Sequence, residues 1–143
     1  MNLQSLMSKR LVTVELDDTL ETVKEIFDEL KVHHVLVVED HRLIGVVSDR
    51  DLWKALSPYI DSIVETARDV ATLHKRVHHV MSRKPLTLQA DAPVSAAIDV
   101  MLAHRISCVP VVDGDNVPVG IVSWRDILKA VARTVDTDVA VGM

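Results

Sequence analysis

One short stretch occurs twice in this chain. Residues 45–52 read Gly-Val-Val-Ser-Asp-Arg-Asp-Leu, and residues 120–127 read Gly-Ile-Val-Ser-Trp-Arg-Asp-Ile. The flanking sequence repeats as well, at a constant offset that changes only at a single-residue insertion in the second copy. The matching segments are Met7-Ser8 with Met81-Ser82, Thr13-Val14 with Thr87-Leu88, and residues 32–38 with 106–112. The chain is therefore a tandem duplication, and its fold must use two copies of one supersecondary unit.

The first copy is predicted to contain a strand, a helix, two strands and a second helix. Apolar residues at helical spacing predict a helix that begins near Asp17-Asp18-Thr19 and ends at about Lys31. Runs of β-branched residues predict strands over 11–14, 35–38 and 43–47. Ser48 is expected to begin the closing helix.

The second copy predicts the same order of elements. Strands are expected over 86–88, 109–112 and 117–122, with a helix that begins at Pro93 and a closing helix after Ser123. Pro110 and Pro118 lack an N–H group, so we expect them at strand starts or in edge strands.

The segment between the copies predicts one long helix. Its apolar residues fall on one face of a helical projection and its charged residues on the other, over about six turns. Polar residues after Arg133 predict a frayed tail. The predicted organisation is a first repeat (1–57), a connecting helix (58–80), a second repeat (81–133) and a C-terminal tail (134–143).

Composition excludes several classes of protein. The 143 residues suffice for one domain or for two small halves that share a core. A net charge of −5 and an aromatic content of 3% argue against nucleic acid as a partner. No apolar run approaches the roughly 18 residues that span a bilayer, and we recognise no signal peptide. Cys108 is the single cysteine, which rules out an internal disulfide. We therefore expect a cytoplasmic protein without membrane contact.

Each copy of the duplicated stretch predicts a turn from a strand into a helix. A serine is followed three residues later by an aspartate, which is the spacing of a capping box. The pairs are Ser48 with Asp51 and Ser123 with Asp126. A second interpretation stays open, because free N–H groups at a helix start attract phosphate and Arg50 and Arg125 lie beside them. Hydroxyl, carboxylate and guanidinium groups could together hold a phosphorylated sugar.

The repeated unit opens with Met-Ser and closes on Gly-apolar-apolar-Ser-x-x-Asp, and it resembles a pair of cystathionine-β-synthase (CBS) domains from about Leu6 to Val131. The resemblance implies an α/β fold in which two β-α-β-β-α repeats pack through their sheets into a pseudo-twofold Bateman module with two clefts. Modules of this kind commonly bind AMP, ADP or ATP, and less often S-adenosylmethionine. They bind these as regulatory ligands, and they often form homodimers. The resemblance thus implies a stand-alone, non-enzymatic sensor that binds an adenine nucleotide between its repeats.

The resemblance also implies roles for individual residues. Asp51 and Asp126 would accept hydrogen bonds from ribose hydroxyls, and Ser48 and Ser123 would hold sugar or phosphate. The side chains expected near phosphate are Arg50, Arg125, His33 and His34. Adenine would lie near Thr13-Val14 and Val35-Leu36 in one copy and near Thr87-Leu88 and Val109-Pro110 in the other. The second copy has Ser107-Cys108 in place of the two histidines, so the two clefts need not be equally occupied.

Other interpretations remain open. The duplicated fold could serve as a ligand-free dimerisation or protein-interaction module. An enzyme finds little support, because the chain has no Gly-rich phosphate loop and no ordered Ser/His/Asp set. His74 and His78 have the i, i+4 spacing of a metal-binding pair, with His79 adjacent. A solvated or interfacial role is expected instead, because no Glu-x-x-His frame and no third ligand lie close in sequence.

Overall fold

The computed structural model describes the backbone of residues 1–142 and the side chains of residues 1–135. Two compact units form: the first-repeat unit is Val12–Pro85, and the second-repeat unit joins Met1–Leu11 to the chain from Leu86 onward. The helices are α1 (Leu20–Leu30), α2 (Asp49–Ala55), α3 (Ala67–Ala71), α4 (Val94–His104) and α5 (Trp124–Gly142). The strands are β1 (Thr13–Val14), β2 (His34–Glu39), β3 (Arg42–Ser48), β4 (Ser82–Arg83), β5 (Cys108–Val112) and β6 (Pro118–Ser123). Short 3₁₀ turns lie at Leu3–Ser5, Thr72–His74 and Val77–His79. The mixed α/β architecture and the order of elements agree with the prediction.

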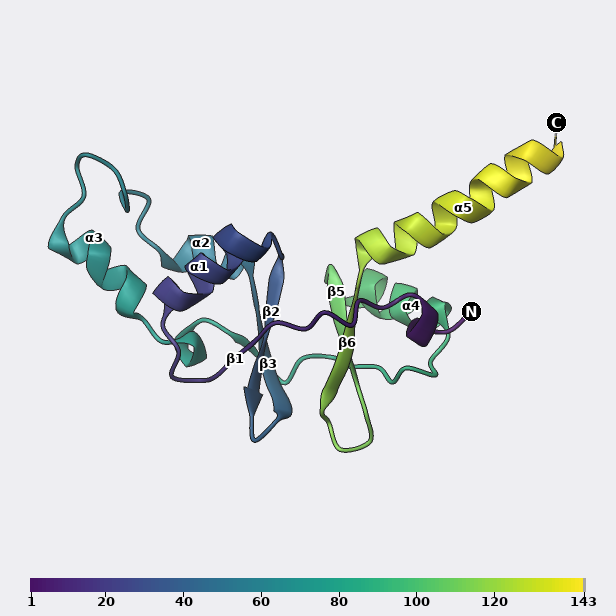
Figure 1. Ribbon diagram of the computed structural model, residues 1–143, viewed down its shortest axis with the longest axis horizontal. Helices are drawn as coiled ribbons and strands as arrows, with labels where there is room; N and C mark the ends of the chain where they lie inside the picture. The colour runs from purple at the N-terminus through teal and green to yellow at the C-terminus, as the bar shows by residue number, and fades with distance from the viewer. Residues whose placement is uncertain (143) are drawn as a thin grey trace. The chain divides into compact units, whose positions relative to one another are not determined.

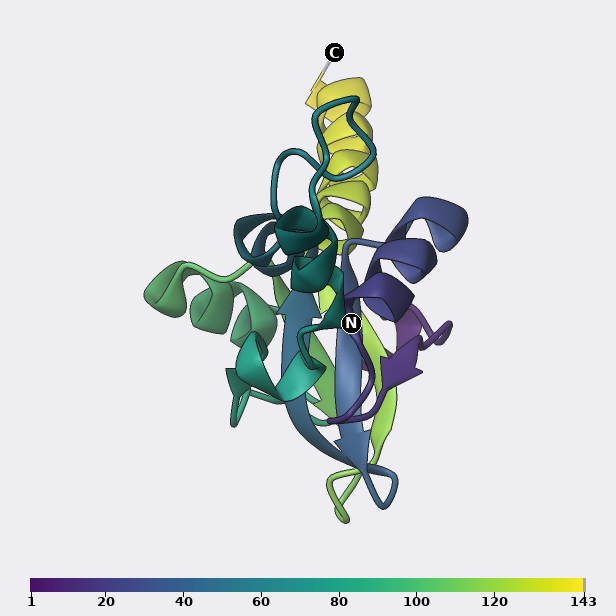
Figure 2. The same ribbon diagram turned by 90° about the vertical axis from the view of Figure 1, so that its left-hand side faces the viewer.

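The first-repeat unit is a four-stranded sheet in the order β1-β2-β3-β4. β1 runs parallel to β2, and the other neighbours are antiparallel. α1 and α2 cover one face of this sheet (Figures 1 and 2). Their apolar side chains form one core with the inward residues of β2 and β3, because alternate strand positions share a face. Members of this core include Leu20, Val23, Val35, Val37, Val47 and Leu52.

The second-repeat unit repeats this arrangement with fewer strands. β5 and β6 form an antiparallel pair, and Ala97, Met101 and Ile127 from α4 and α5 pack against its inward face. The strand predicted at residues 86–88 is reduced to a single parallel bridge between Leu88 and Val111.

Pro110 gives the physical reason for that shortened strand. In the first-repeat unit the equivalent Leu36 N–H donates to Val12 O at 3.0 Å. Proline has no N–H group, so that bond has no counterpart. Pro118 begins β6, and Pro110 lies in a two-stranded sheet, so both follow the expectation for proline.

The Met-Ser segments are exchanged between the repeats. Ser8, which opens the first repeat in sequence, bridges to Ile121 in β6, and their N–H and C=O groups pair at 2.9 and 3.0 Å. Ser82, which opens the second repeat, pairs with Val46 in β3. The amino-terminal segment therefore belongs to the packing of the second repeat, and the segment before Leu86 belongs to that of the first.

The repeated glycines make room for these exchanged segments. A Cβ atom on Gly45 would lie 2.7 Å from Met81 Sδ and 2.9 Å from Ser82 O. A Cβ atom on Gly120 would lie 2.5 Å from Met7 Sδ and 3.1 Å from Ser8 O. Neither glycine has a positive φ, so close approach of the backbone, not its conformation, requires glycine here.

Gly45→Ala and Gly120→Ala are each expected to lower the free energy of unfolding by about 1–3 kcal/mol, the usual cost of overpacking a tight site. Chemical denaturation would measure the change. Gly114→Ala is the matched control, since a Cβ atom there meets nothing within 4 Å. Equal stability of all three variants would contradict the packing described for the exchanged segments.

The prediction of one long helix over 58–80 is wrong. Thr66 and Asp69 form a capping box that begins a separate short helix, α3. Lys75 and Arg76 are extended, and the flanking backbone pairs with the start of α1, where Leu20 N donates to Lys75 O and Val77 N to Asp18 O. Three of the apolar residues that suggested a helical stripe instead pack in the first-repeat core, namely Ile60, Leu73 and Val77, whereas Ile63 and Val64 are exposed.

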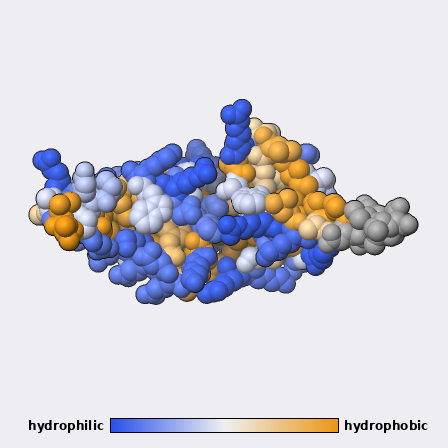
Figure 3. Space-filling model, turned by 90° about the horizontal axis from the view of Figure 1, so that it is seen from above, coloured by the Kyte–Doolittle hydropathy of each residue, from blue (hydrophilic) through white to orange (hydrophobic). Residues whose placement is uncertain are grey.

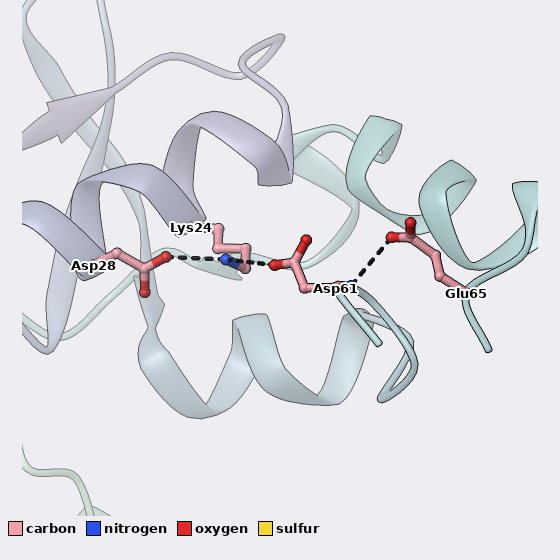
Figure 4. Close-up of polar contacts among 4 residues, drawn as sticks. All are labelled: Lys24, Asp28, Asp61 and Glu65. Atoms are coloured by element: carbon pink, nitrogen blue, oxygen red, sulfur yellow. Dashed lines mark hydrogen bonds and ion pairs between the residues drawn. The ribbon is translucent and has the colours of Figure 1, made fainter. Parts of the chain in front are cut away.

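Polar contacts tie the turn before α3 to α1. Lys24 Nζ lies 3.0 Å from an Asp28 carboxylate oxygen and 3.7 Å from one of Asp61 (Figure 4). The Asp61 N–H donates to Glu65 at 3.2 Å. The hydrogen bond to Asp28 is the main cause that raises the pKa of Lys24.

The prediction of a frayed tail after Arg133 is also wrong, because the helical backbone of α5 continues to Gly142. The sequence from Trp124 to Val141 contains neither glycine nor proline, so nothing interrupts the helix. Within the described residues, no helix combines the length and apolar character needed to cross a membrane.

Candidate functional site

Each repeat contains the predicted strand-to-helix turn with a complete capping box. At the first turn, Ser48 Oγ accepts from Asp51 N at 3.1 Å and Asp51 Oδ2 accepts from Ser48 N at 2.9 Å. At the second turn, Ser123 Oγ accepts from Asp126 N at 3.3 Å and Asp126 Oδ2 accepts from Ser123 N at 2.8 Å. The capping interpretation is confirmed for both pairs.

Capping leaves part of each carboxylate available. Both bonds from Ser123, through its N–H and its hydroxyl, reach the same oxygen of Asp126. Asp51 likewise uses Oδ2 for its cap. Among the described residues, neither Oδ1 atom receives a hydrogen bond. Both side chains are half-buried, so each aspartate can cap its helix and still accept bonds from a ligand.

The structure brings His33 and His34 to the first turn. The Asp49 N–H donates to His33 O at 3.0 Å, and His34 is the partner of Ser48 in the β2–β3 register. His33 Nδ1 lies 3.0 Å from Asp49 Oδ2. Arg50 is exposed on the same turn. The two histidines therefore join the arginine, the serine and the carboxylates in one neighbourhood.

Two pKa shifts describe the charge at this turn. Burial lowers the pKa of His34 below its usual value, against the opposing influence of Asp49. Burial acts to raise the pKa of Asp49, but hydrogen bonds from His33 and from the Arg50 N–H outweigh it and leave that pKa below its usual value. At neutral pH, Asp49 is therefore ionised and His34 uncharged.

The lowered pKa of the half-buried His34 predicts that the free energy of unfolding depends on pH. The unfolded chain takes up a proton on His34 near pH 6.5, whereas the folded protein does so only at lower pH. The free energy of unfolding should therefore fall as the pH drops from 7 through 6.5, with a slope of at most about 1.4 kcal/mol per pH unit from this group. Asp49 contributes separately, at pH values below about 4.

Denaturation at several pH values would test this prediction. His34→Gln should flatten the slope between pH 7 and pH 5.5, while the exposed His74→Gln should retain it. A slope that is unchanged in His34→Gln would contradict the assignment.

The second turn uses the same backbone frame with different side chains. Ser107 O accepts from Trp124 N at 3.0 Å, as His33 O does from Asp49, and Cys108 is the register partner of Ser123. The Arg125 guanidinium lies over the Trp124 ring, 5.6 Å from its centroid. Burial raises the pKa of Cys108 to about 12, which makes that thiol unreactive at neutral pH.

The residues predicted near adenine lie on β1 and β2 in the first repeat, and on residues 87–88 and β5 in the second. Thr13 and Val14 pair with Leu36 and Val37, and Thr13 is exposed. Val14 and Val109 belong to the two hydrophobic cores, so their side chains are enclosed by protein. Thr87 is half-buried, and Leu88 N donates to Pro110 O at 3.2 Å.

Sequence reasoning missed Asp49 and Trp124. Each directly follows the serine of its turn and occupies the first position of its helix. The contact of Asp49 with His33 joins residues 16 apart in sequence, so no local pattern reveals it. The available signal was that the two copies differ at this one position between otherwise matching Ser and Arg residues.

A cavity of about 190 Å³ lies elsewhere in the first-repeat unit, at the opposite end of β2. Its lining residues are Glu15, Leu16, Asp17, Val38, Glu39 and Asp40. Four of these are acidic, which suits the cavity poorly to a phosphate group.

Within the part of the chain that the structure describes, no group of three or more His, Cys, Asp or Glu side chains could hold a metal ion. The rings of His78 and His79 contact each other, with centroids 4.0 Å apart.

Comparison with known sequences identifies relatives of the chain. The family model for the CBS domain matches residues 3–57 and 77–133. A CBS domain-containing protein of Dictyostelium discoideum is 31% identical over 135 residues, which are 93% of this chain and 92% of that protein. Homoserine O-acetyltransferase of Methanococcoides burtonii is 30% identical over 126 residues, and the match spans 87% of this chain but 23% of that enzyme. Inosine-5'-monophosphate dehydrogenase of Methanocaldococcus jannaschii is 26% identical over 122 residues, and the match spans 85% of this chain but 22% of that enzyme.

Solved structures of similar fold include CBS domain pairs. The CBS domain pair of protein MJ0100, in complex with 5'-methylthioadenosine and S-adenosyl-L-methionine, has a TM-score of 0.78 and 25% identity, covering 94% of this chain and 98% of that chain. CBSX2 of Arabidopsis thaliana in complex with AMP has a TM-score of 0.76 and 25% identity, covering 93% and 97%. The chain therefore belongs to the CBS domain family and carries a tandem pair of CBS domains.

Proposed function

We propose that this protein is a regulatory CBS pair that binds an adenine nucleotide at its strand-to-helix turns and acts as a ligand sensor. The observation that carries the proposal is the pair of half-buried carboxylates, Asp51 and Asp126, each with one oxygen used for capping and one without a hydrogen bond among the described residues. Similar CBS pairs are solved with AMP and with S-adenosyl-L-methionine, which supports an adenosine-type ligand.

The proposed contacts follow the chemistry of each group. A carboxylate oxygen accepts from ribose hydroxyls, and Ser48 and Ser123 hold sugar or phosphate. Arg50 and Arg125 reach phosphate, because a guanidinium carries a permanent charge and several donors. His33 and His34 lie near phosphate at the first turn only. Adenine lies near Thr13-Val14 in the first repeat, or near Thr87 and Val109-Pro110 in the second.

AMP, ADP or ATP is the proposed ligand class, with S-adenosylmethionine as the less favoured member. The ligand is bound and released without chemical change, so the protein is not proposed as an enzyme. A cytoplasmic setting is proposed because the sequence has a single cysteine and so cannot form an internal disulfide.

A second function is favoured by the exposed face of α5. Large apolar side chains recur there at i, i+4, i+7 and i+11, each 43–52% exposed, and the space-filling view shows apolar atoms along this helix (Figure 3). They are Trp124, Leu128, Val131 and Val135. A helix with such a stripe suits pairing with another helix. This face supports a homodimer, and it would also suit a ligand-free interaction module.

A thermal-shift panel tests the sensor function. The panel contains AMP, ADP, ATP, their guanine counterparts and S-adenosylmethionine. A ligand present at about 100 times its Kd adds roughly 2.7 kcal/mol, which should raise the Tm by about 5–11 °C for a chain near this size. We expect adenine compounds to produce the shift and guanine compounds not to produce it. A flat panel would contradict the sensor function and favour the interaction module.

A further inference from the structure

The first turn contains a contact between His33 and Asp49 that the second turn lacks. His33 Nδ1 and Asp49 Oδ2 lie 3.0 Å apart, and the same two residues are joined by the backbone bond from Asp49 N to His33 O, also 3.0 Å long. A carboxylate only accepts hydrogen bonds, so Nδ1 carries the proton that it donates. The doubled contact fixes the Asp49 carboxylate against the imidazole, one residue after Ser48 and two before Asp51.

The second turn has no counterpart of this carboxylate. The matching backbone bond joins Trp124 N to Ser107 O at 3.0 Å, so the frame is the same. Trp124 takes the place of Asp49, and its ring lies beneath the Arg125 guanidinium. The chain therefore contains one backbone frame twice, with an acidic residue in one copy and an aromatic residue in the other.

The charges of the two turns differ as a result. The first turn holds the carboxylates of Asp49 and Asp51 with the guanidinium of Arg50, and the second holds one carboxylate, Asp126, with Arg125. Asp49 is ionised at neutral pH and His34 is not, because the pKa of each lies below its usual value. The first turn is thus the poorer host for negative charge.

We propose that Asp49 makes the first-repeat site selective for adenosine ligands with at most one phosphate, whereas the second-repeat site, with Trp124 at that position, accepts longer phosphate chains. This inference rests on the proposed function, since it concerns the same two turns. Each added phosphate brings at least one more negative charge toward the side chains at positions 33 and 49. A fixed negative charge beside the ligand repels a longer phosphate chain more strongly than a single phosphate. This selectivity does not require any loss of contacts to the nucleoside.

Variants with a single site make the two turns measurable one at a time. Asp126→Ala leaves the first-repeat site, and Asp51→Ala leaves the second-repeat site. Calorimetric titration with AMP, ADP and ATP in magnesium-free buffer gives the ratio of AMP affinity to ATP affinity for each. We expect this ratio to be at least tenfold higher at the first-repeat site than at the second. Equal ratios of AMP affinity to ATP affinity in the two variants would overturn the inference. This test leaves Asp49 itself unchanged.

Substitution of Asp49 supplies a second measurement. In the Asp126→Ala background, Asp49→Asn keeps an acceptor for His33 but removes the charge, and it should lower the AMP preference about tenfold. The double change His33→Ser with Asp49→Trp copies the second turn and should give its ligand preference. Glu29→Gln is the control, because it removes one charge from an exposed site on α1 and should leave the ratio unchanged.

The outcomes separate the inference from the proposed function. One outcome in the Asp126→Ala background is that a further Asp51→Ala change abolishes binding while Asp49→Asn leaves the AMP preference within twofold of its starting value. That combination would overturn the inference and leave the proposed function standing. Absence of binding of every adenosine compound to the unmodified protein would overturn both.

Discussion

Changing both Asp51 and Asp126 to alanine is expected to lower the affinity for adenine nucleotides at least 100-fold while the protein stays folded. A hydrogen bond to a charged group contributes about 1.5–3 kcal/mol, and each carboxylate is proposed to accept bonds from two ribose hydroxyls. The loss of two such bonds at a site exceeds the roughly 2.7 kcal/mol that corresponds to 100-fold. The same change removes part of each capping box, which costs about 1 kcal/mol of stability per helix.

Asp69→Ala is the control for the structural part of that effect. Asp69 forms the capping box of α3 with Thr66, where its Oδ2 accepts from Thr66 N at 2.8 Å, and it has no contact with the proposed site residues. We expect Asp69→Ala to lose comparable stability and to keep full affinity. Loss of binding in this control would mean that reduced stability, not the missing carboxylates, explains the result. Full affinity in the double alanine variant would contradict the ribose assignment.

Leu3→Ala is expected to destabilise the second-repeat unit by about 2–5 kcal/mol, the range for large-to-small changes in a core. Leu3 is fully buried in the second-repeat core, near Ala97 and Met101, although it precedes the first repeat's strands in sequence. Its N–H donates to Ala92 O at 3.0 Å, which fixes the segment in place.

Chemical denaturation and amide hydrogen exchange would measure this effect. Protection should fall for amides of α4, β5 and β6. Leu102→Ala is the matched control, because that leucine lies on α4 of the same unit and is 75% exposed, so the change should cost little. A stable Leu3→Ala variant would contradict the exchange of amino-terminal segments between the repeats.

Much of the fold follows from local patterns. The duplication, the order of strands and helices and the capping boxes at Ser48 and Ser123 could all be predicted, because each depends on residues close in sequence. The segment 58–80 could not, because apolar residues that fold back onto a core share the spacing of a helical stripe. Thr66-x-x-Asp69 was a visible sign of a new helix start within that segment.

The exchanged segments and the charged contact at the first turn depend on distant residues. The sequence contains Met-Ser and Gly in each repeat, but nothing local indicates that Met7 lies against Gly120 and Met81 against Gly45. The pairing of His33 with Asp49 likewise requires β2 and α2 to be placed together. The shortened strand at 86–88 could have been anticipated, because Pro110 removes a donor that Leu36 supplies in the first repeat.

Calorimetric titration of the unmodified protein with AMP, beside the double variant Asp51→Ala/Asp126→Ala, tests whether the two carboxylates bind an adenine nucleotide. We expect saturable binding of AMP to the unmodified protein and no measurable binding to the folded double variant. Binding of AMP to both with equal affinity would contradict the proposed site, and binding to neither, with no response to ADP, ATP or S-adenosylmethionine, would contradict the sensor function itself.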